Sequence, residues 1–184
     1  PGDNEVVLTL SHSGNAEIYK LNLKTKKVSP LTNHWAADVD PSVSKNGDKI
    51  VFLSSRPGRP MIYAMNTNGV EKGVRRISFV GDFNATPRFS PKGNEIVFSS
   101  WLDNRFDLFK ISFDGKNLYR LTKDFGSNED PSFSPDGELI AFTSQRIISD
   151  SEDSKNIYLM NSEGEILKKI TDKQGHCQSP RWFK

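Results

Sequence analysis

The stretch DPSFSPDGELIAFTS at residues 130–144 decides the fold, because the chain repeats it. TPRFSPKGNEIVFSS at residues 86–100 and DPSVSKNGDKIVFLSS at residues 40–55 keep the same order: a proline, a glycine six positions later, and a phenylalanine five positions after that. The repeated prolines, with one more near the C-terminus, are 46, 44 and 49 residues apart: Pro41, Pro87, Pro131 and Pro180. A period of about 40–50 residues is typical of solenoids and propellers.

The pattern inside each repeat favours an all-β propeller. Short β-branched and aromatic runs follow one another, and no segment keeps a helical period for three turns. The runs expected as central, third and outer strands are residues 50–53, 96–98, 61–65, 108–111, 157–160, 76–78, 120–122 and 169–171. The joints that supply the positive φ of tight turns are Asn46-Gly47, Asn68-Gly69, Asp114-Gly115 and Asp136-Gly137. Four short antiparallel strands per repeat make one propeller blade, with the proline strand innermost and the I-V-F strand buried.

Both ends of the chain continue the repeat. PGDNEVVL at residues 1–8 aligns with PKGNEIVF, and SPRWFK at residues 179–184 resembles an inner strand without the rest of its blade. We therefore expect a single domain over residues 1–184 with four blade-equivalents, of which one is split between residues 1–32 and 179–184. Residues 180–183 are predicted to pair with residues 6–10, because closing the ring removes exposed sheet edges.

The composition excludes several functional classes. The 184 residues include 25 basic and 23 acidic side chains, and a net charge of +2 with scattered basic residues does not favour a nucleic-acid partner. No apolar run approaches the length of a membrane helix, so we expect no membrane insertion. Cys177 is the single cysteine and cannot form an internal disulfide. The chain is expected to be a monomer.

No catalytic motif accompanies the repeat, and the sequence indicates no cofactor: G-x-S-x-G, H-E-x-x-H, a phosphate-binding Gly-Lys-Ser/Thr loop and C-x-x-C are all missing. The loops that precede the repeated prolines, residues 33–40, 81–86, 125–130 and 175–179, are expected to form one mouth of the central channel. His34 and His176 lie in these loops, where a metal or catalytic function and plain loop histidines are both open. Trp35 is a candidate interface anchor, because it lies outside any periodic pattern.

Carboxylates also gather in these loops. Asp40 and Asp130 directly precede the repeated proline, and Asp38 and Glu129 lie close by. Hard oxygen ligands around one opening suit calcium. The alternative, which we favour, is that each side chain caps its own turn.

The repeat resembles that of the TolB-type propeller family, most closely in FSPDG at residues 133–137 and IAFTS at residues 140–144, and in the SPRWF ending. The resemblance covers essentially the whole chain. Members of that family have a six-bladed propeller preceded by an α/β domain, whereas this chain has four blade-equivalents and no such domain. The resemblance implies a non-enzymatic periplasmic scaffold of the Tol–Pal system, which maintains the outer membrane during division.

By the same resemblance, the mouth would bind the peptidoglycan-associated lipoprotein Pal, and the channel would accept extended peptide segments. The family's Pal-contacting positions map to Val39, Asp40, Ala85, Thr86, Glu129, Asp130, Gln178 and Ser179. Together with His34, Trp35, Asp38 and His176, these residues form the predicted partner-binding site.

Two enzyme-related alternatives stay open. The first is a non-catalytic propeller domain of a prolyl-oligopeptidase-like peptidase, in which the ring screens access to a hydrolase absent from this chain. The second is a lyase that acts on acidic sugars with a metal held by histidines at the channel mouth, and oligogalacturonate lyases are similar in the placement of their histidines. The lyase interpretation needs three or four convergent histidines, and only His34 and His176 are suitably placed.

Overall fold

The computed structural model describes residues 4–12, 14–124, 126–146, 154–172 and 175–183. In this part of the chain there are fifteen β-strands and no helix, and hence no helix that could cross a membrane. The first sheet has three strands, β1 (Glu5–Leu10), β2 (Glu17–Asn22) and β3 (Val28–Pro30). The second has four, β4 (Asp38–Val43), β5 (Lys49–Ser54), β6 (Met61–Asn66) and β7 (Arg75–Arg76).

The other two sheets repeat this order. The third contains β8 (Phe83–Phe89), β9 (Glu95–Leu102), β10 (Arg105–Ser112) and β11 (Tyr119–Arg120). The fourth contains β12 (Ser127–Phe133), β13 (Leu139–Gln145), β14 (Lys155–Asn161) and β15 (Ile166–Lys169). Consecutive strands pair antiparallel within each sheet, so the predicted all-β blades are confirmed.

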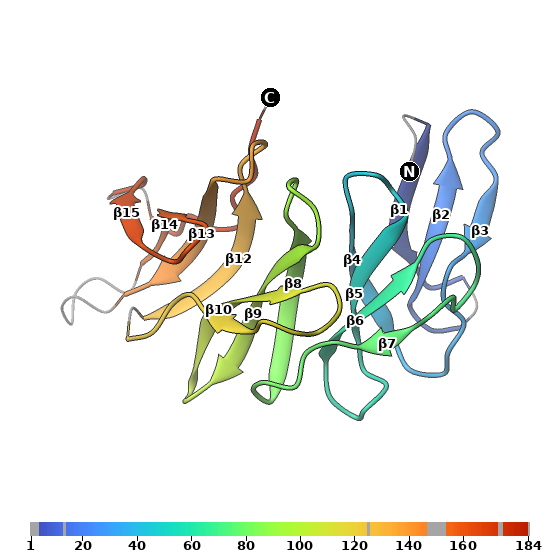
Figure 1. Cartoon of the computed structure of the whole chain (residues 1–184), viewed down its shortest axis with the longest axis horizontal. Helices are drawn as coiled ribbons and strands as arrows, with labels where there is room; N and C mark the ends of the chain where they lie inside the picture. Colours follow the sequence, from blue (N-terminus) through green and yellow to red (C-terminus); the bar gives the residue numbers. More distant parts are fainter. Residues whose placement is uncertain (1–3, 13, 125, 147–153, 173–174, 184) are drawn as a thin grey trace.

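The hydrophobic core lies between the sheets, and Figure 1 shows the sheets following one another from β1–β3 at one end to β12–β15 at the other. Each junction has its own buried cluster. Phe52, Phe98 and Phe142, the repeated phenylalanines of the central strands, are fully buried in three different clusters. The I-V-F strands are therefore buried, as their composition predicts, because both of their faces pack against side chains.

The turn after each inner strand is set by the repeated glycine. The nitrogen of Gly47 donates to Ser44 O at 2.9 Å, and that of Gly137 donates to Ser134 O at 2.9 Å. Both glycines have positive φ, 74° and 75°, which explains why no other residue stands there. The prediction for Asn68-Gly69 was wrong: positive φ occurs instead at Glu71 and Gly73, because Glu71 is held by a bond from its nitrogen to Leu31 O in the neighbouring sheet.

The outer strands end earlier than their sequence pattern predicts. Ser78 and Thr122 follow β7 and β11 rather than closing them. Their hydroxyl oxygens accept the backbone N–H of Ile62 at 2.8 Å and of Leu108 at 2.9 Å. A side-chain oxygen therefore takes the place of the ladder bond, and Thr32 and Thr171 do the same in the first and fourth sheets.

The predicted closure of the ring is not what the structure has. The described residues 175–183 form no strand with β1 and lie along the fourth sheet, beside β12 in Figure 1. The reason is that this segment enters like the inner strands β4 and β8: Cys177 N donates to Lys155 O at 2.8 Å, as Asp38 N donates to Ala16 O at 2.8 Å and Asn84 N to Pro60 O at 2.9 Å. That contact fixes it at the end of the arc opposite β1, and the first sheet stays three-stranded.

Candidate docking face and channel

The residue before each repeated proline has an unusual backbone. Asp40, Thr86, Asp130 and Ser179 all have positive φ, between 49° and 55°. Such values are uncommon outside glycine and exceptional for a β-branched threonine. The pairing of each inner strand with its neighbour also shifts register at this point, so each of the three inner strands carries a β-bulge. A bulge re-aims the side chains beside it.

These re-aimed side chains bond to neighbouring strands. Asp40 Oδ1 accepts from Arg88 Nη1 at 2.9 Å, and Ser179 Oγ donates to Asp130 Oδ2 at 2.8 Å. The hydroxyls of Thr86 and Ser99 lie 3.0 Å apart. In the part of the chain that the structure describes, no three His, Cys, Asp or Glu side chains are grouped so that they could hold a metal ion.

The predicted site also includes the residue just before each of these four positions, and these residues differ in exposure. Val39, Ala85 and Glu129 are half-buried, whereas Gln178 is exposed. Glu129 Oε1 pairs with Lys155 Nζ at 3.2 Å, which links β12 to β14.

Both mouth histidines make contacts that organise their own loops. His34 donates its backbone N–H to Glu17 Oε1 at 2.7 Å, and its Nδ1 accepts the N–H of Ala36 at 3.1 Å. His176 Nδ1 accepts the N–H of Lys155 at 3.4 Å. Their ring nitrogens therefore support loop geometry, which agrees with the interpretation of plain loop histidines.

Buried polar side chains fix the base of the mouth, and the sequence analysis did not identify them. Glu17 and Asp107, at the start of β2 and beside the start of β10, are fully buried, and their carboxylates accept hydrogen bonds from Thr32 and Thr122. Asn156 holds the same place in β14, where its side-chain oxygen accepts from Thr171 at 3.2 Å. A signal was available, since the hydroxyl residues recur at the spacing of the prolines: Thr32, Ser78, Thr122 and Thr171.

Asp38 does not face a partner-binding surface; it is fully buried at the base of the mouth. Its Oδ2 accepts from Arg56 Nη2 at 2.7 Å, and Arg56 also forms a two-bond pair with Glu71. Burial acts to lower the pKa of Arg56, but the hydrogen bonds to Glu71 and Asp38 outweigh it and raise the pKa. Burial likewise acts to raise the pKa of Glu71, but the hydrogen bonds from Arg56 and from the backbone of Asn33, together with the charge of Arg56, outweigh it and lower the pKa.

Large aromatic side chains stand out from the mouth. Trp35 is 79% exposed and Phe79, just before loop 81–86, is 72% exposed. The Trp35 ring lies against the His34 ring, with centroids 5.3 Å apart and the planes tilted by 34°, and Phe79 lies under the guanidinium of Arg76 at 4.5 Å. These contacts hold the rings in place while leaving most of their surface in water.

A groove of about 610 Å³ opens between the β9–β10 hairpin and the start of β12. Trp101 and Phe106 form one wall, with ring centroids 5.1 Å apart. Glu129 and Arg105 line it as well, so the groove presents both signs of charge. Glu129 is also a predicted partner-binding residue, so the groove reaches the predicted site.

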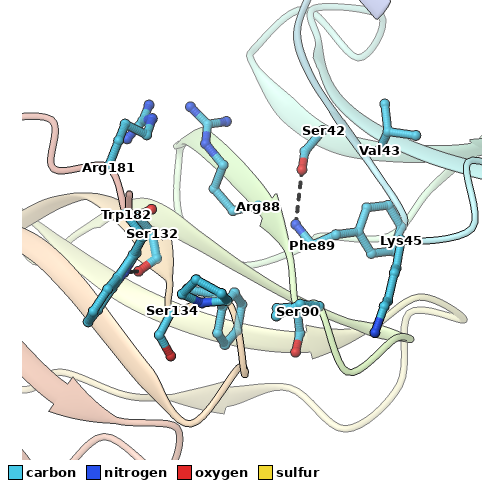
Figure 2. A pocket seen from close by; sticks show the side chains of 13 residues that line it. Ser42, Val43, Lys45, Arg88, Phe89, Ser90, Ser132, Ser134, Arg181 and Trp182 are labelled. Atoms are coloured by element: carbon cyan, nitrogen blue, oxygen red, sulfur yellow. Dashed lines mark hydrogen bonds between the residues drawn. The ribbon is translucent and has the colours of Figure 1, made fainter. Parts of the chain in front are cut away.

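A second cavity, of about 420 Å³, lies in the channel on the far side of the prolines from the mouth (Figure 2). We call it the channel cavity; its lining includes Ser42, Lys45, Arg88, Phe89, Arg181 and Trp182. Trp182 is 37% exposed and donates its indole N–H to Ser132 O at 2.8 Å. The inner strands thus line the channel, as their place in the repeat predicts.

Four successive antiparallel sheets with the mouth at one end and a channel between their inner strands define the class of β-propeller domains. Comparison with known proteins identifies the family: a model described as the TolB beta propeller domain matches residues 1–184, and the chain belongs to this family.

Relatives with curated sequences support the assignment. The Tol-Pal system protein TolB of Helicobacter hepaticus is 31% identical over 148 residues, which cover 77% of this chain and 34% of the relative. A TolB homolog of Chlorobium luteolum is 32% identical over 145 residues, 78% of this chain and 32% of the relative. The matched region therefore spans about a third of each of these relatives.

Solved structures share the fold. TolB from Acinetobacter baumannii superposes with a TM-score of 0.78 at 24% identity over 99% of this chain and 44% of that protein. An oligogalacturonate lyase and a puromycin-hydrolysing peptidase, each 17% identical, have TM-scores of 0.69 and 0.66. At such identities the likeness concerns the fold alone.

Proposed function

We propose that this propeller is a non-enzymatic docking module of the Tol–Pal system, which binds a Pal-like lipoprotein through its mouth in the periplasm. Membership of the TolB family supports the system, and the names of the curated relatives refer to it. The observation that carries the docking assignment is the pair of highly exposed aromatic residues, Trp35 and Phe79, on loops whose bases are fixed by buried polar contacts.

Such a surface suits protein recognition for a physical reason. Aromatic side chains are enriched among the residues that carry most of the binding energy, because they bury a large area with few rotatable bonds. Loops held by a rigid scaffold also lose little conformational entropy when they bind. The groove beside Trp101 adds a recess at the rim in which a partner side chain can be buried.

The histidine contacts weigh against the lyase alternative. His34 and His176 each use Nδ1 to accept a backbone N–H group. In a neutral imidazole this arrangement places the proton on Nε2, so neither ring nitrogen offers a free lone pair to a metal ion.

Calorimetric titration with the soluble domain of Pal tests the proposal. Trp35→Ala and Phe79→Ala are each expected to weaken binding about 30-fold, which corresponds to about 2 kcal/mol. Tyr119→Ala is the matched control, because Tyr119 is 57% exposed on the outer strand β11, away from the mouth. Affinity that survives both mouth substitutions, or that falls equally with Tyr119→Ala, would refute docking at this surface.

A second pair of variants tests the predicted polar positions. Asp40→Asn and Asp130→Asn keep a side chain that tolerates positive φ, whereas lysine at these positions would strain the backbone. If the residues before the prolines contact the partner, loss of charge there changes the affinity without loss of folded structure. Unchanged affinity in both variants would restrict the site to the aromatic residues.

A further inference from the structure

The channel cavity contains two arginines that docking at the mouth does not use. Arg88 and Arg181 directly follow Pro87 and Pro180, so they hold equivalent positions on two strands. Figure 2 shows both guanidinium groups at the same end of the cavity, whereas the ammonium of Lys45 points toward the other end. Two like charges are thereby placed close together beside an open space.

These two charges are incompletely compensated. Arg88 Nη1 pairs with Asp40 Oδ1 at 2.9 Å and also bonds to Pro87 O. Arg181 Nη1 bonds to Pro180 O at 2.7 Å, and within the described residues it has no carboxylate at ion-pair distance. Burial and the nearby charge of Arg88 lower the pKa of Arg181, although Asp130 and Asp40 act in the opposite direction. An anion would relieve this excess of positive charge.

The cavity also suits a small ligand in size and lining. Its volume of about 420 Å³ falls in the range of small-molecule sites. Phe89 and Trp182 provide an apolar wall, and Trp182 is held by its bond to Ser132. A guanidinium presents two parallel N–H groups that match the two oxygens of a carboxylate or phosphate.

We propose that the channel cavity binds a small oxyanion, a carboxylate or a phosphate, between Arg88 and Arg181. The site lies beyond the prolines from the mouth and shares no aromatic anchor with it, although Arg88 pairs with Asp40 of the predicted partner-binding site. The assignment does not rest on the proposed docking of Pal, because it is argued from the cavity and its own lining. The ligand is a small molecule that carries at least one such group.

Calorimetric titration of the chain with citrate and with pyrophosphate tests the site and distinguishes the two chemistries. Arg181→Gln is expected to weaken the bound probe about tenfold, because one charge-assisted bidentate contact is lost. Arg181→Lys keeps the charge but lacks the two parallel N–H groups, so its affinity for the probe should lie between those of the unmodified chain and Arg181→Gln. Arg59→Gln is the matched control: it removes one positive charge at the exposed pair with Asp82, and should change affinity less than about twofold.

The variant is suited to the test because Arg181 bonds only to its own backbone neighbour among the described residues, so the fold does not depend on it. Saturable binding of either probe, lost in Arg181→Gln and kept in Arg59→Gln, supports the site, and the preferred probe identifies the anion. Absence of saturable binding to the unmodified chain would overturn the proposal, as would equal losses in Arg181→Gln and Arg59→Gln.

Discussion

The second and third sheets each bury an aspartate that pairs with an arginine, but the aspartate and the arginine stand at different positions in the two sheets. At the start of the third strand of the third sheet, buried Asp107 accepts from Thr122 at 2.9 Å and pairs with Arg120 in the same sheet. The second sheet has Met61 at the equivalent position. Its buried acid is Asp38 on the inner strand, and the cation that pairs with it is Arg56 from the β5–β6 connection.

The backbone contact beneath these charges is constant. Ser78 and Thr122 accept the backbone N–H of the third strand at nearly the same distance, although one has Met61 beside it and the other Asp107. The repeat therefore requires the hydroxyl, and it tolerates an acid on either of two strands. When one charge of a pair is removed, the loss in the free energy of unfolding should therefore depend on how deeply the remaining partner is buried.

Arg56→Ala should have the largest effect on stability. The substitution leaves Asp38, which is fully buried, and Glu71 without their cation, and an orphaned buried charge costs about 3–5 kcal/mol. The free energy of unfolding, measured by urea denaturation at pH 7, should fall by that amount. Asp38→Asn is the matched variant: it places in the second sheet the residue type of Asn84 and Asn128, and it should cost less than Arg56→Ala. Equal losses would mean that stability depends on the Asp38 carboxylate itself, and not on whether a buried carboxylate is left without its cation.

Asp107→Asn should cost about 2 kcal/mol, because charged hydrogen bonds contribute about 1.5–3 kcal/mol each. The amide keeps the shape and can still accept from Thr122. The cation left behind, Arg120, has 23% of its side chain exposed and can be hydrated. Its pKa, raised first by the hydrogen bond to Asp107, should return toward its usual value. A loss as large as that of Arg56→Ala, measured by the same denaturation, would contradict the explanation based on exposure.

The repeat predicts most of the fold because its signals are local. The phenylalanines of the central strands and the turn glycines act within a few residues of their own position, so period and composition were sufficient to place them. The path of residues 180–183 could not be predicted in this way. Two ends were available for pairing, and the outcome depended on the contact of Cys177 N with Lys155 O. That contact repeats the one between Asp38 N and Ala16 O, but a backbone hydrogen bond leaves no mark in the side chains that a comparison of repeats uses.

The candidate site likewise has features that the sequence predicts and features that depend on contacts between residues distant in sequence. The mouth loops followed from their place in the repeat, and the exposure of Trp35 agrees with its position outside the periodic pattern. The burial of Asp38 did not, because it depends on Arg56, which is 18 residues away in sequence and belongs to another loop. The pairing of Arg88 with Asp40 joins two different repeats, and comparison of equivalent positions cannot reveal it.

Glu71 should give the second sheet its own dependence on pH. Its pKa is lowered in the folded state, so its contribution to stability is complete above pH 4.5, the usual value for glutamate, and is lost as the pH falls through the folded pKa. Glu71→Gln should therefore flatten the acid limb of the stability curve. Urea midpoints measured between pH 7 and pH 3 test this, with Glu165→Gln, at an exposed position, as the control. Parallel acid limbs for Glu71→Gln and the unmodified chain would contradict it.

Lys92→Ala should have the smallest effect. Lys92 and Glu138 join the turns of the third and fourth sheets by an ion pair, and their side chains are 48% and 63% exposed. Water already solvates both charges, so the pair should contribute no more than about 0.5 kcal/mol, and less at high salt. Urea denaturation at low and high ionic strength measures this against Arg56→Ala. A large loss that persists at high salt would contradict this account, because it would mean that Lys92 stabilises the contact by packing and not as a screened surface charge.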